Sequence, residues 1–307
     1  MHCFNTEVGI MRKKYHMKRN STSFTLVAST FVIAFTVLAL YPFLLLIAGS
    51  FTSEAAIYKY GFSLIPKEFS TAAYEMIFKS PQKIINAYGI TILITTLGTG
   101  LGLLVTSMTA YVLANRNFRY ADKFAFFFYF TTLFGGGLIA YYVWLVRYLH
   151  IKNTIFVLFV PQCLSVFNIL VMRNFVKTIP HEMRESAKID GASEFTIYAK
   201  IYIPMMKPVL ATIALFLALG YWNNWSAAML YIDNEKLYPL QYLLYQMTSN
   251  TGFLANATAQ AGVPMPEVPQ QSMKLALTVI TIGPIILVYP FVQKYFVQGL
   301  SIGAVKG

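Results

Sequence analysis

Residues 180–208, PHEMRESAKIDGASEFTIYAKIYIPMMKP, are the most informative stretch of the sequence. Their composition favours helix, and Asp190-Gly191 interrupts them with a turn signal that lets two short helices fold back on each other. Pro204 and Pro208 mark the start of the next long helix, because proline is tolerated in a first helical turn. A charged hairpin this small cannot build its own core. We therefore expect it to dock on another surface, with a solvated connection as the alternative.

Apolar runs free of Asp, Glu, Lys and Arg lie on both sides of this hairpin, and about 20 such residues suffice to cross a bilayer. The runs are Phe24–Thr52, Ile84–Asn115, Phe124–Val146, Asn153–Met172, Pro208–Ile232 and Leu275–Gln293. A seventh run, 237–266, carries Gly, Pro and amide side chains typical of a loop, with room for a short helix at 240–247. The sequence therefore predicts an all-α, polytopic membrane protein with six transmembrane helices.

Composition and charge agree with this interpretation. Hydrophobic residues make up 57% of the 307 and charged residues 12%, where a soluble domain has roughly 25% charged residues. The net charge of +12 comes from residues that lie between the apolar runs, so we expect no nucleic-acid partner. With both ends inside, 16 of the 24 Lys and Arg residues are cytoplasmic, which predicts cytoplasmic tails at 1–23 and 298–307 and a first span at 24–52.

Several chemistries lack the residues that they need. No predicted span contains an ionisable Asp, Glu, Lys or Arg, which argues against proton-driven transport and leaves backbone-coordinated Na⁺ coupling open. The chain has no GxxxxGK[ST] phosphate loop, and His181-Glu182 does not complete an HExxH metal motif, because residue 185 is Glu. We expect no catalytic residue, no metal site and no cofactor site in this chain.

The hairpin resembles the EAA loop of ABC importer permeases. That pattern is EAA, three residues, Gly, nine residues and I-x-L-P, and here Ser186 and Ile203 replace an Ala and a Leu. The resemblance implies that the hairpin couples the permease to an ATPase, through Glu185, Ser186, Ala187, Asp190, Gly191 and Pro204. Ala187 and Gly191 are small residues four apart, which allows close approach of another surface.

Other motifs place the resemblance in the carbohydrate (maltose-type) branch, in the subfamily for complex oligosaccharides, over roughly residues 20–307. They include KIDGAS at 188–193, FGGGLI at 134–139, WNNW at 222–225 and the C-terminal KYFVQGLSIGAVKG. The resemblance implies a type I ABC importer permease fold, with a core at 84–297 that contains the coupling hairpin at 180–204. Because Ala140 stands where relatives often have Pro, we expect a straighter third helix.

The same resemblance implies a machine with several subunits in the plasma (inner) membrane of a prokaryote. A second homologous permease subunit completes the pore, two ATPase subunits bind ATP-Mg, and an extracellular or periplasmic solute-binding protein delivers an oligosaccharide. This chain would then transport sugar without hydrolysing ATP. Three alternatives remain open: an ABC permease for amino acids or peptides, a non-ABC membrane scaffold or receptor, and a channel or secondary carrier.

Sugar sites combine aromatic faces with amides and hydroxyls, and three patches in the spans have that character. At helical spacing, Gln162, Ser165 and Asn168 form a polar stripe, and Trp222, Trp225 and Met229 share a face next to Asn223. The third patch is Tyr141, Trp144 and Tyr148. The alternative is that the aromatics are interfacial anchors and that the amides join helices. Gly98-x-x-x-Gly102 predicts close helix packing.

Overall fold

A computed structural model describes residues 22–79, 81–249 and 269–304, which are helical almost throughout and contain no β-strand. The helices of the first half are α1 (Thr22–Ser50), α2 (Glu54–Tyr60), α3 (Ala72–Phe78), α4 (Pro81–Ala114), α5 (Ala121–Leu133), α6 (Gly137–Val143), the π-helix η1 (Trp144–Tyr148), α7 (Phe156–Phe159), the 3₁₀-helix η2 (Val160–Gln162) and α8 (Val166–Val176). Those of the second half are α9 (Glu182–Ile189), α10 (Glu194–Ile197), the π-helix η3 (Tyr198–Tyr202), α11 (Ile203–Met205), α12 (Lys207–Trp222), α13 (Ser226–Tyr231), the 3₁₀-helix η4 (Glu235–Leu237) and α15 (Gln270–Ala304). Residues 240–249 are also helical.

Three of these helices are long and apolar enough to cross a membrane: α1, α4 and α15. Three further candidates are pairs of helices with a bend between them, namely α5 with α6–η1, α7–η2 with α8, and α10–α11 with α12. Counting each bent pair as one span gives the six that the sequence predicts. The run at 237–266 is not among them, and its residues 250–266 lie outside the described part of the chain.

The third span is sharply bent, so the expectation of a straighter helix is wrong. Its two halves meet at 113°, at the break between Leu133 and Gly137. Phe134 is extended at φ −125° and ψ 100°, and Gly137 has a φ of +80°, which favours glycine. The glycine run, three residues before Ala140, breaks the helix, so the replacement of a proline at residue 140 does not straighten it.

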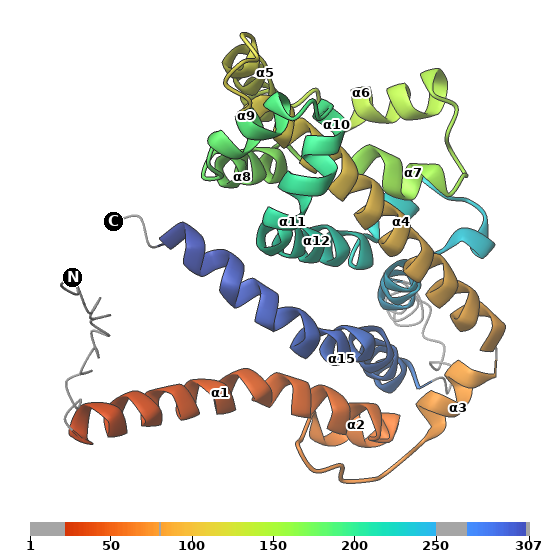
Figure 1. Cartoon of the computed structure of the whole chain (residues 1–307). Coiled ribbons are helices and arrows are strands. Elements are labelled where there is room, and N and C mark those ends of the chain that lie inside the picture. The colour runs from red at the N-terminus through yellow and green to blue at the C-terminus, as the bar shows by residue number, and fades with distance from the viewer. Residues whose placement is uncertain (1–21, 80, 250–268, 305–307) are drawn as a thin grey trace.

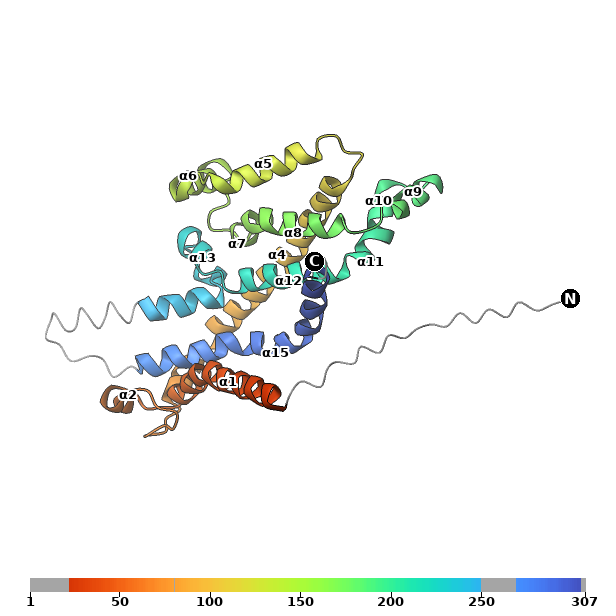
Figure 2. The same cartoon turned by 90° about the vertical axis from the view of Figure 1, so that its left-hand side faces the viewer.

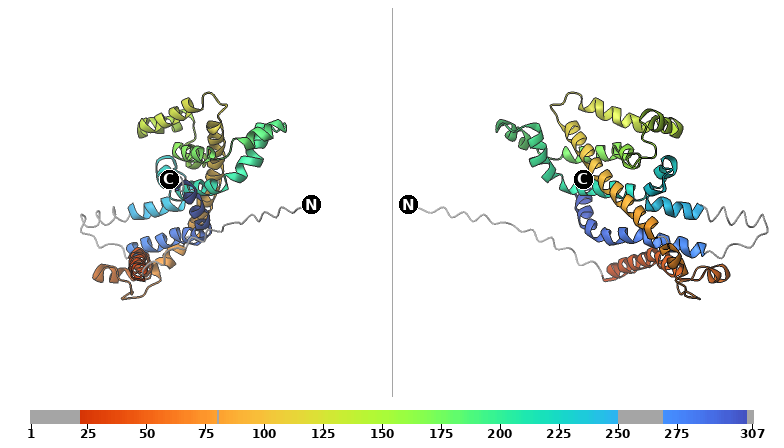
Figure 3. Two further views of the ribbon diagram at one scale, coloured as in Figure 1. Left: turned by 60° about the vertical axis from the view of Figure 1, so that its left-hand side comes forward. Right: turned by 90° about the vertical axis from the view of Figure 1, so that its right-hand side faces the viewer.

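The α9–α10 hairpin and the short helices α2 and α13 lie toward opposite ends of the molecule (Figure 2). Figure 1 shows α1 and α15 packed side by side, with α4 running diagonally against α12. In Figure 2 the α9–α10 hairpin lies at one end, with the start of α1 toward the same side, and α2 and α13 lie toward the other end. Both views in Figure 3 show the same opposition. We call these the hairpin end and the loop end.

Close packing of α4 on α12 holds the centre of the fold together. A Cβ at Gly98 would lie 2.5 Å from the ring of Tyr221, and one at Gly102 would lie 3.0 Å from Leu217. The Tyr221 hydroxyl donates to the carbonyl of Phe159, at 3.0 Å, which ties α7 to the same contact. The prediction of close helix packing at Gly98 and Gly102 is therefore confirmed.

A carboxylate at the loop end fastens the first extramembrane segment to the last helix. Glu54 accepts hydrogen bonds from the backbone N–H groups of Gln271 and Ser272, at 2.9–3.1 Å, and from the Ser272 hydroxyl. A negative charge is favourable at the start of a helix, where backbone N–H groups have no intrahelical acceptor. Glu54 thus fixes the start of α15 beside α2.

Candidate coupling hairpin

The hairpin turn is built on Gly191. α9 ends in a Schellman motif, in which the Gly191 N–H donates to the carbonyl of Lys188 and the Ala192 N–H donates to the carbonyl of Ala187. This motif places its glycine in the left-handed region, and Gly191 has a φ of +76°. The turn expected at Asp190-Gly191 is therefore confirmed. A Cβ at Gly191 would meet no atom within 4 Å, so only the backbone angle requires glycine within this chain.

The second arm begins at Ser193, whose hydroxyl caps α10 by accepting from the Thr196 N–H at 3.2 Å. α10, η3 and α11 continue without a break to Met205, and α12 then leaves at an angle of 82°. Pro204 is exposed in α11, and Pro208 lies in the first turn of α12, as expected from the sequence. The second arm of the hairpin is therefore followed directly by α12, with only the bend between them.

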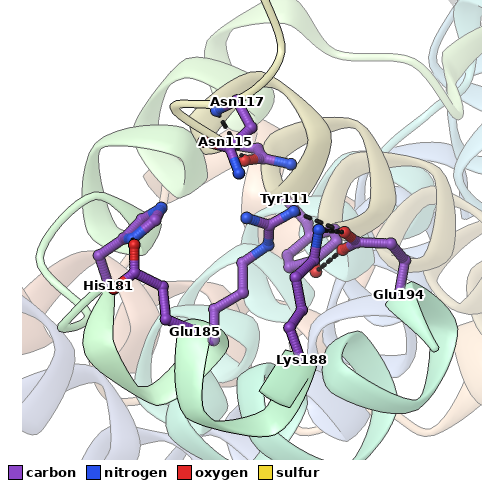
Figure 4. A network of polar contacts seen from close by, with 8 residues as sticks. Tyr111, Asn115, Asn117, His181, Glu185, Lys188 and Glu194 are labelled. Atoms are coloured by element: carbon purple, nitrogen blue, oxygen red, sulfur yellow. Dashed lines mark hydrogen bonds and ion pairs between the residues drawn. The ribbon is translucent and has the colours of Figure 1, made fainter. Parts of the chain in front are cut away.

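Three basic or phenolic groups converge on one carboxylate between the two arms. Arg184 on α9 is 2% exposed, and its Nη2 lies 2.5 Å from Oε1 of Glu194 on α10. Lys188 Nζ lies 2.8 Å from the same oxygen, and the Tyr111 hydroxyl on α4 donates to Oε2 at 2.7 Å. Figure 4 shows Tyr111 and Lys188 gathered at Glu194. Glu194 therefore joins both arms of the hairpin to the end of a spanning helix.

This environment keeps Glu194 ionised. Its partial burial by itself raises the pKa, but hydrogen bonds from Lys188, Tyr111 and Arg184 outweigh that effect and lower the pKa to about 2, from an ordinary 4.5. Charge-assisted hydrogen bonds favour the carboxylate over the carboxylic acid. Near neutral pH the hairpin is thus held by a fully charged group.

The residues expected to contact an ATPase divide into exposed and half-buried ones. Glu185, Ser186 and Asp190 are exposed, and Glu185 lies 3.0 Å from Nδ1 of His181 in the turn before α9. Ala187 is half-buried and packs against this chain's own apolar core. The exposed face of the hairpin can therefore meet a partner, while Ala187 also supports the hairpin from inside.

Sequence reasoning missed the residues that hold the hairpin in place, Tyr111, Arg184 and Glu194. One signal was available, because Arg184 and Lys188 are four apart on one helical face and a carboxylate follows across the turn. It also missed the apolar side chains on the hairpin surface. Ile189 is 86% exposed and Phe195 is 68% exposed, on either side of Gly191.

The polar stripe predicted at Gln162, Ser165 and Asn168 does not lie on one continuous helix. Gln162 belongs to η2, and Asn168 belongs to α8, which meets the α7–η2 helix at 45°. Ser165 lies in the break and caps α8, where its hydroxyl faces the Asn168 N–H at 3.4 Å. The expected helical spacing is wrong because the chain uses Ser165 to start a new helix.

The aromatic face predicted on the fifth span is also divided. α12 ends at Trp222, and α13 starts at Ser226, so Asn223 and Trp225 lie in the connection. Trp222 Nε1 donates to the carbonyl of Thr281 on α15 at 3.3 Å. Trp225 stacks on Tyr245, with ring centroids 4.2 Å apart and an interplanar angle of 16°. Both indoles therefore join separate elements, and Asn223 is exposed between them.

The aromatics of the third span remain close together: Tyr141 and Trp144 have ring centroids 6.1 Å apart, on α6 and η1. No group of three His, Cys, Asp or Glu side chains within the described ranges is placed to hold a metal ion.

Six candidate spans, with a buttressed polar hairpin projecting from one end, define the membrane subunit of a transport system. The chain belongs to the family of binding-protein-dependent transport system inner membrane components, whose model matches residues 123–302. The EAA resemblance of residues 185–204 is explained by this membership. Membrane localisation follows from the same membership and from the apolar spans.

Relatives and a solved structure agree with the family assignment. The chain is 40% identical to Protein LplC of Bacillus subtilis (strain 168) over 272 residues, covering 88% of this chain and 90% of the relative. It is 35% identical to the polygalacturonan/rhamnogalacturonan transport system permease protein YtcP of the same strain, covering 90% and 96%. It superposes with a TM-score of 0.77, at 30% identity, on a chain of a bacterial ABC transporter involved in import of the acidic polysaccharide alginate, covering 91% and 98%. The type I permease fold predicted from the sequence is confirmed.

Proposed function

We propose that this chain is one half of the translocation pore of an ATP-driven oligosaccharide importer and that its α9–α10 hairpin couples the pore to an ATPase subunit. The observation that carries the proposal is the hairpin surface. Ile189 and Phe195 are apolar and exposed at the hairpin end, and the turn between them is held to α4 through Glu194. Exposed apolar side chains on an otherwise polar, braced element are typical of a docking surface.

The partners that we propose are those of the family to which the chain belongs. A second homologous permease completes the pore, two ATPase subunits bind ATP-Mg, and a solute-binding protein delivers the sugar at the loop end. Closure of the ATPase dimer moves the hairpin, and the short α10–α11 arm passes that motion through the 82° bend to α12. α12 packs on α4 and α15, so the movement reaches three spans. The chain contributes no catalytic group to ATP hydrolysis.

We further propose an oligosaccharide that contains uronic acids as the first substrate to test. The name of YtcP refers to polygalacturonan and rhamnogalacturonan, and the solved structure belongs to a transporter involved in alginate import. All of these polymers are acidic polysaccharides. The test is uptake into proteoliposomes that contain the complete importer, with galacturonide, mannuronide and neutral oligosaccharides compared. ATP-dependent uptake that needs the binding protein supports the proposal. Uptake without ATP would indicate a channel or a secondary carrier, and uptake of amino acids or peptides alone would indicate another solute class.

Trp225→Ala is expected to lower oligosaccharide uptake several-fold without loss of assembly, because it removes the indole face opposite Tyr245 on which a sugar ring can stack, and a stacking contact of this kind is worth about 1 kcal/mol. The measurement is the initial rate of uptake at low substrate, together with recovery of the ATPase on a tagged permease. Trp144→Ala is the comparison variant, since Trp144 is an indole of another candidate sugar patch, on a different span. A loss with Trp144→Ala alone would move the sugar contact to η1, and no loss with either variant would place it on the partner permease.

The topology that we propose has the hairpin end in the cytoplasm. In a Cys3→Ser background, Lys236→Cys should react with an impermeant thiol reagent on intact cells, and Ile189→Cys should react only after permeabilisation. Both positions are exposed, and the native Cys163 is buried, so the labels report the introduced residues. Labelling of Ile189→Cys but not of Lys236→Cys on intact cells would reverse the orientation.

A further inference from the structure

A basic cavity lies at the base of the hairpin, away from the exposed Ile189 and Phe195. It has a volume of about 290 Å³, near the lower end of the roughly 300–1,000 Å³ usual for ligand pockets. The end of α4, the end of α8 and the start of α9 form its walls. Four basic side chains line it, and none of its lining residues is acidic: the basic ones are Arg116, Lys177, His181 and Arg184.

Arg184 is one of the residues that line this cavity, and two of its hydrogen-bond donors are unused. Its side chain is 2% exposed, and only Nη2 is engaged, with Glu194. Its Nε and Nη1 have no hydrogen-bond partner among the described residues. A buried N–H without an acceptor costs about 1–3 kcal/mol, so an acceptor at this position is strongly favoured. Neither Glu194 nor Glu185 is among the residues that line the cavity.

The other basic groups make the cavity electropositive. Arg116, just after α4, and Lys177, just after α8, form no ion pair with any residue of the described part of the chain. His181 uses Nδ1 toward Glu185, and its buried Nε2 has no partner in the described ranges. Figure 4 shows His181 and Asn115 on the side of the network away from Glu194. Glu194 offsets the charge of Arg184 but not those of Arg116 and Lys177.

We propose that this cavity binds a phosphate group, supplied either by the headgroup of an anionic lipid or by soluble phosphate. The unpartnered N–H groups of Arg184 can donate to phosphate oxygens, and cations on two further elements match the remaining charge of a phosphate. Basic pockets beside transmembrane helices also bind anionic headgroups. A phosphate bound there bridges α4, α8 and α9 and fixes the base of the hairpin, whichever solute the pore carries.

The test uses the full chain in a neutral detergent, titrated with sodium phosphate against sodium chloride of equal ionic strength. The readout is the thermal midpoint, from which an apparent Kd is obtained. Arg116→Gln and Lys177→Gln should each weaken the Kd roughly tenfold, the effect of about one charge-assisted contact. Lys200→Gln is the matched control, because it removes an exposed charge from η3, in the second arm of the hairpin, and Lys200 does not line the cavity. This variant should leave the Kd unchanged.

A second arm separates the two sources of phosphate. The chain is placed in nanodiscs of phosphatidylcholine, with or without phosphatidylglycerol, and retained lipid is identified by native mass spectrometry. Retention of phosphatidylglycerol by the wild type but not by Arg116→Gln identifies a headgroup, and a response to phosphate in both membranes identifies a soluble ligand. The proposal is overturned if neither occurs, or if Lys200→Gln is as defective as Arg116→Gln. It is also overturned if the response disappears when the ATPase binds, since the cavity would then belong to that interface.

Discussion

Gly191→Val is expected to abolish coupled transport while the permease still inserts and still pairs with its partner permease. Valine at a φ of +76° costs about 1–3 kcal/mol, because its branched side chain clashes with the backbone there. The Schellman bonds to Lys188 and Ala187 depend on that angle, so the turn that presents Ile189 must rearrange. The measurements are recovery of the ATPase on a tagged permease and binding-protein-stimulated ATP hydrolysis in proteoliposomes.

Gly61 provides a matched control for this substitution. It has a φ of +73°, a ψ of −168° and no atom within 4 Å of an added Cβ, so Gly61→Val imposes backbone strain at the loop end in a region that is essentially restricted to glycine. It should leave ATPase recovery intact. Gly191→Asn should restore most coupling, because asparagine tolerates the left-handed region. Normal coupled transport by Gly191→Val would show that this segment does not couple the two subunits.

Glu194→Gln is expected to loosen the whole hairpin. It leaves the buried guanidinium of Arg184 without its counter-charge and weakens the contacts from Lys188 and Tyr111. We expect a loss of about 1–3 kcal/mol in the free energy of hairpin opening, toward the lower end because the Glu194 side chain is 49% exposed and screened. Hydrogen exchange of residues 182–205 measures the opening, and ATPase recovery on the permease should fall with it.

Glu185→Gln is the control, since Glu185 is exposed and pairs only with His181 among the described residues; it should change hydrogen exchange little. The pH dependence gives a second check. An opened hairpin protonates Glu194 near its ordinary pKa of 4.5, while the closed one stays charged down to about 2. The stability difference between wild type and Glu194→Gln should therefore be complete above pH 4.5 and shrink as the pH falls to about 2. A difference that does not vary over this window would mean that the charge of Glu194 is not what braces the hairpin.

Much of the architecture could be predicted from local sequence. Each of the six charge-free runs overlaps one of the six candidate spans, because crossing a bilayer requires only a sufficient length of apolar residues; the fifth candidate also takes in the charged arm α10–α11. The turn at Asp190-Gly191 could be placed to the residue, because a positive φ selects glycine by steric exclusion within the residue itself. The contact of Gly98 with α12 was foreseen for a similar reason, as only glycine admits so close a neighbour.

The helix breaks inside the spans could not be predicted from the sequence. Periodicity assumes one continuous helix, whereas Ser165 and Asn223 sit where the chain stops one helix and starts another. Side chains at and beside the second break also contact distant parts of the fold, since Trp222 donates to Thr281 and Trp225 stacks on Tyr245. Those partners cannot be identified from neighbouring residues.

The sequence by itself determined the membrane class, the number of spans, the hairpin and its glycine, since each depends on residues within a few positions of one another. Only the tertiary structure showed what holds the hairpin. Tyr111 and Glu194 are 83 residues apart, and the burial of Arg184 between them results from the packing of α4 against the hairpin. From the sequence alone, a charged side chain is expected to be solvated. Whether it is buried and paired depends on helices that are distant in the sequence, because their packing lowers the local dielectric and supplies the partner.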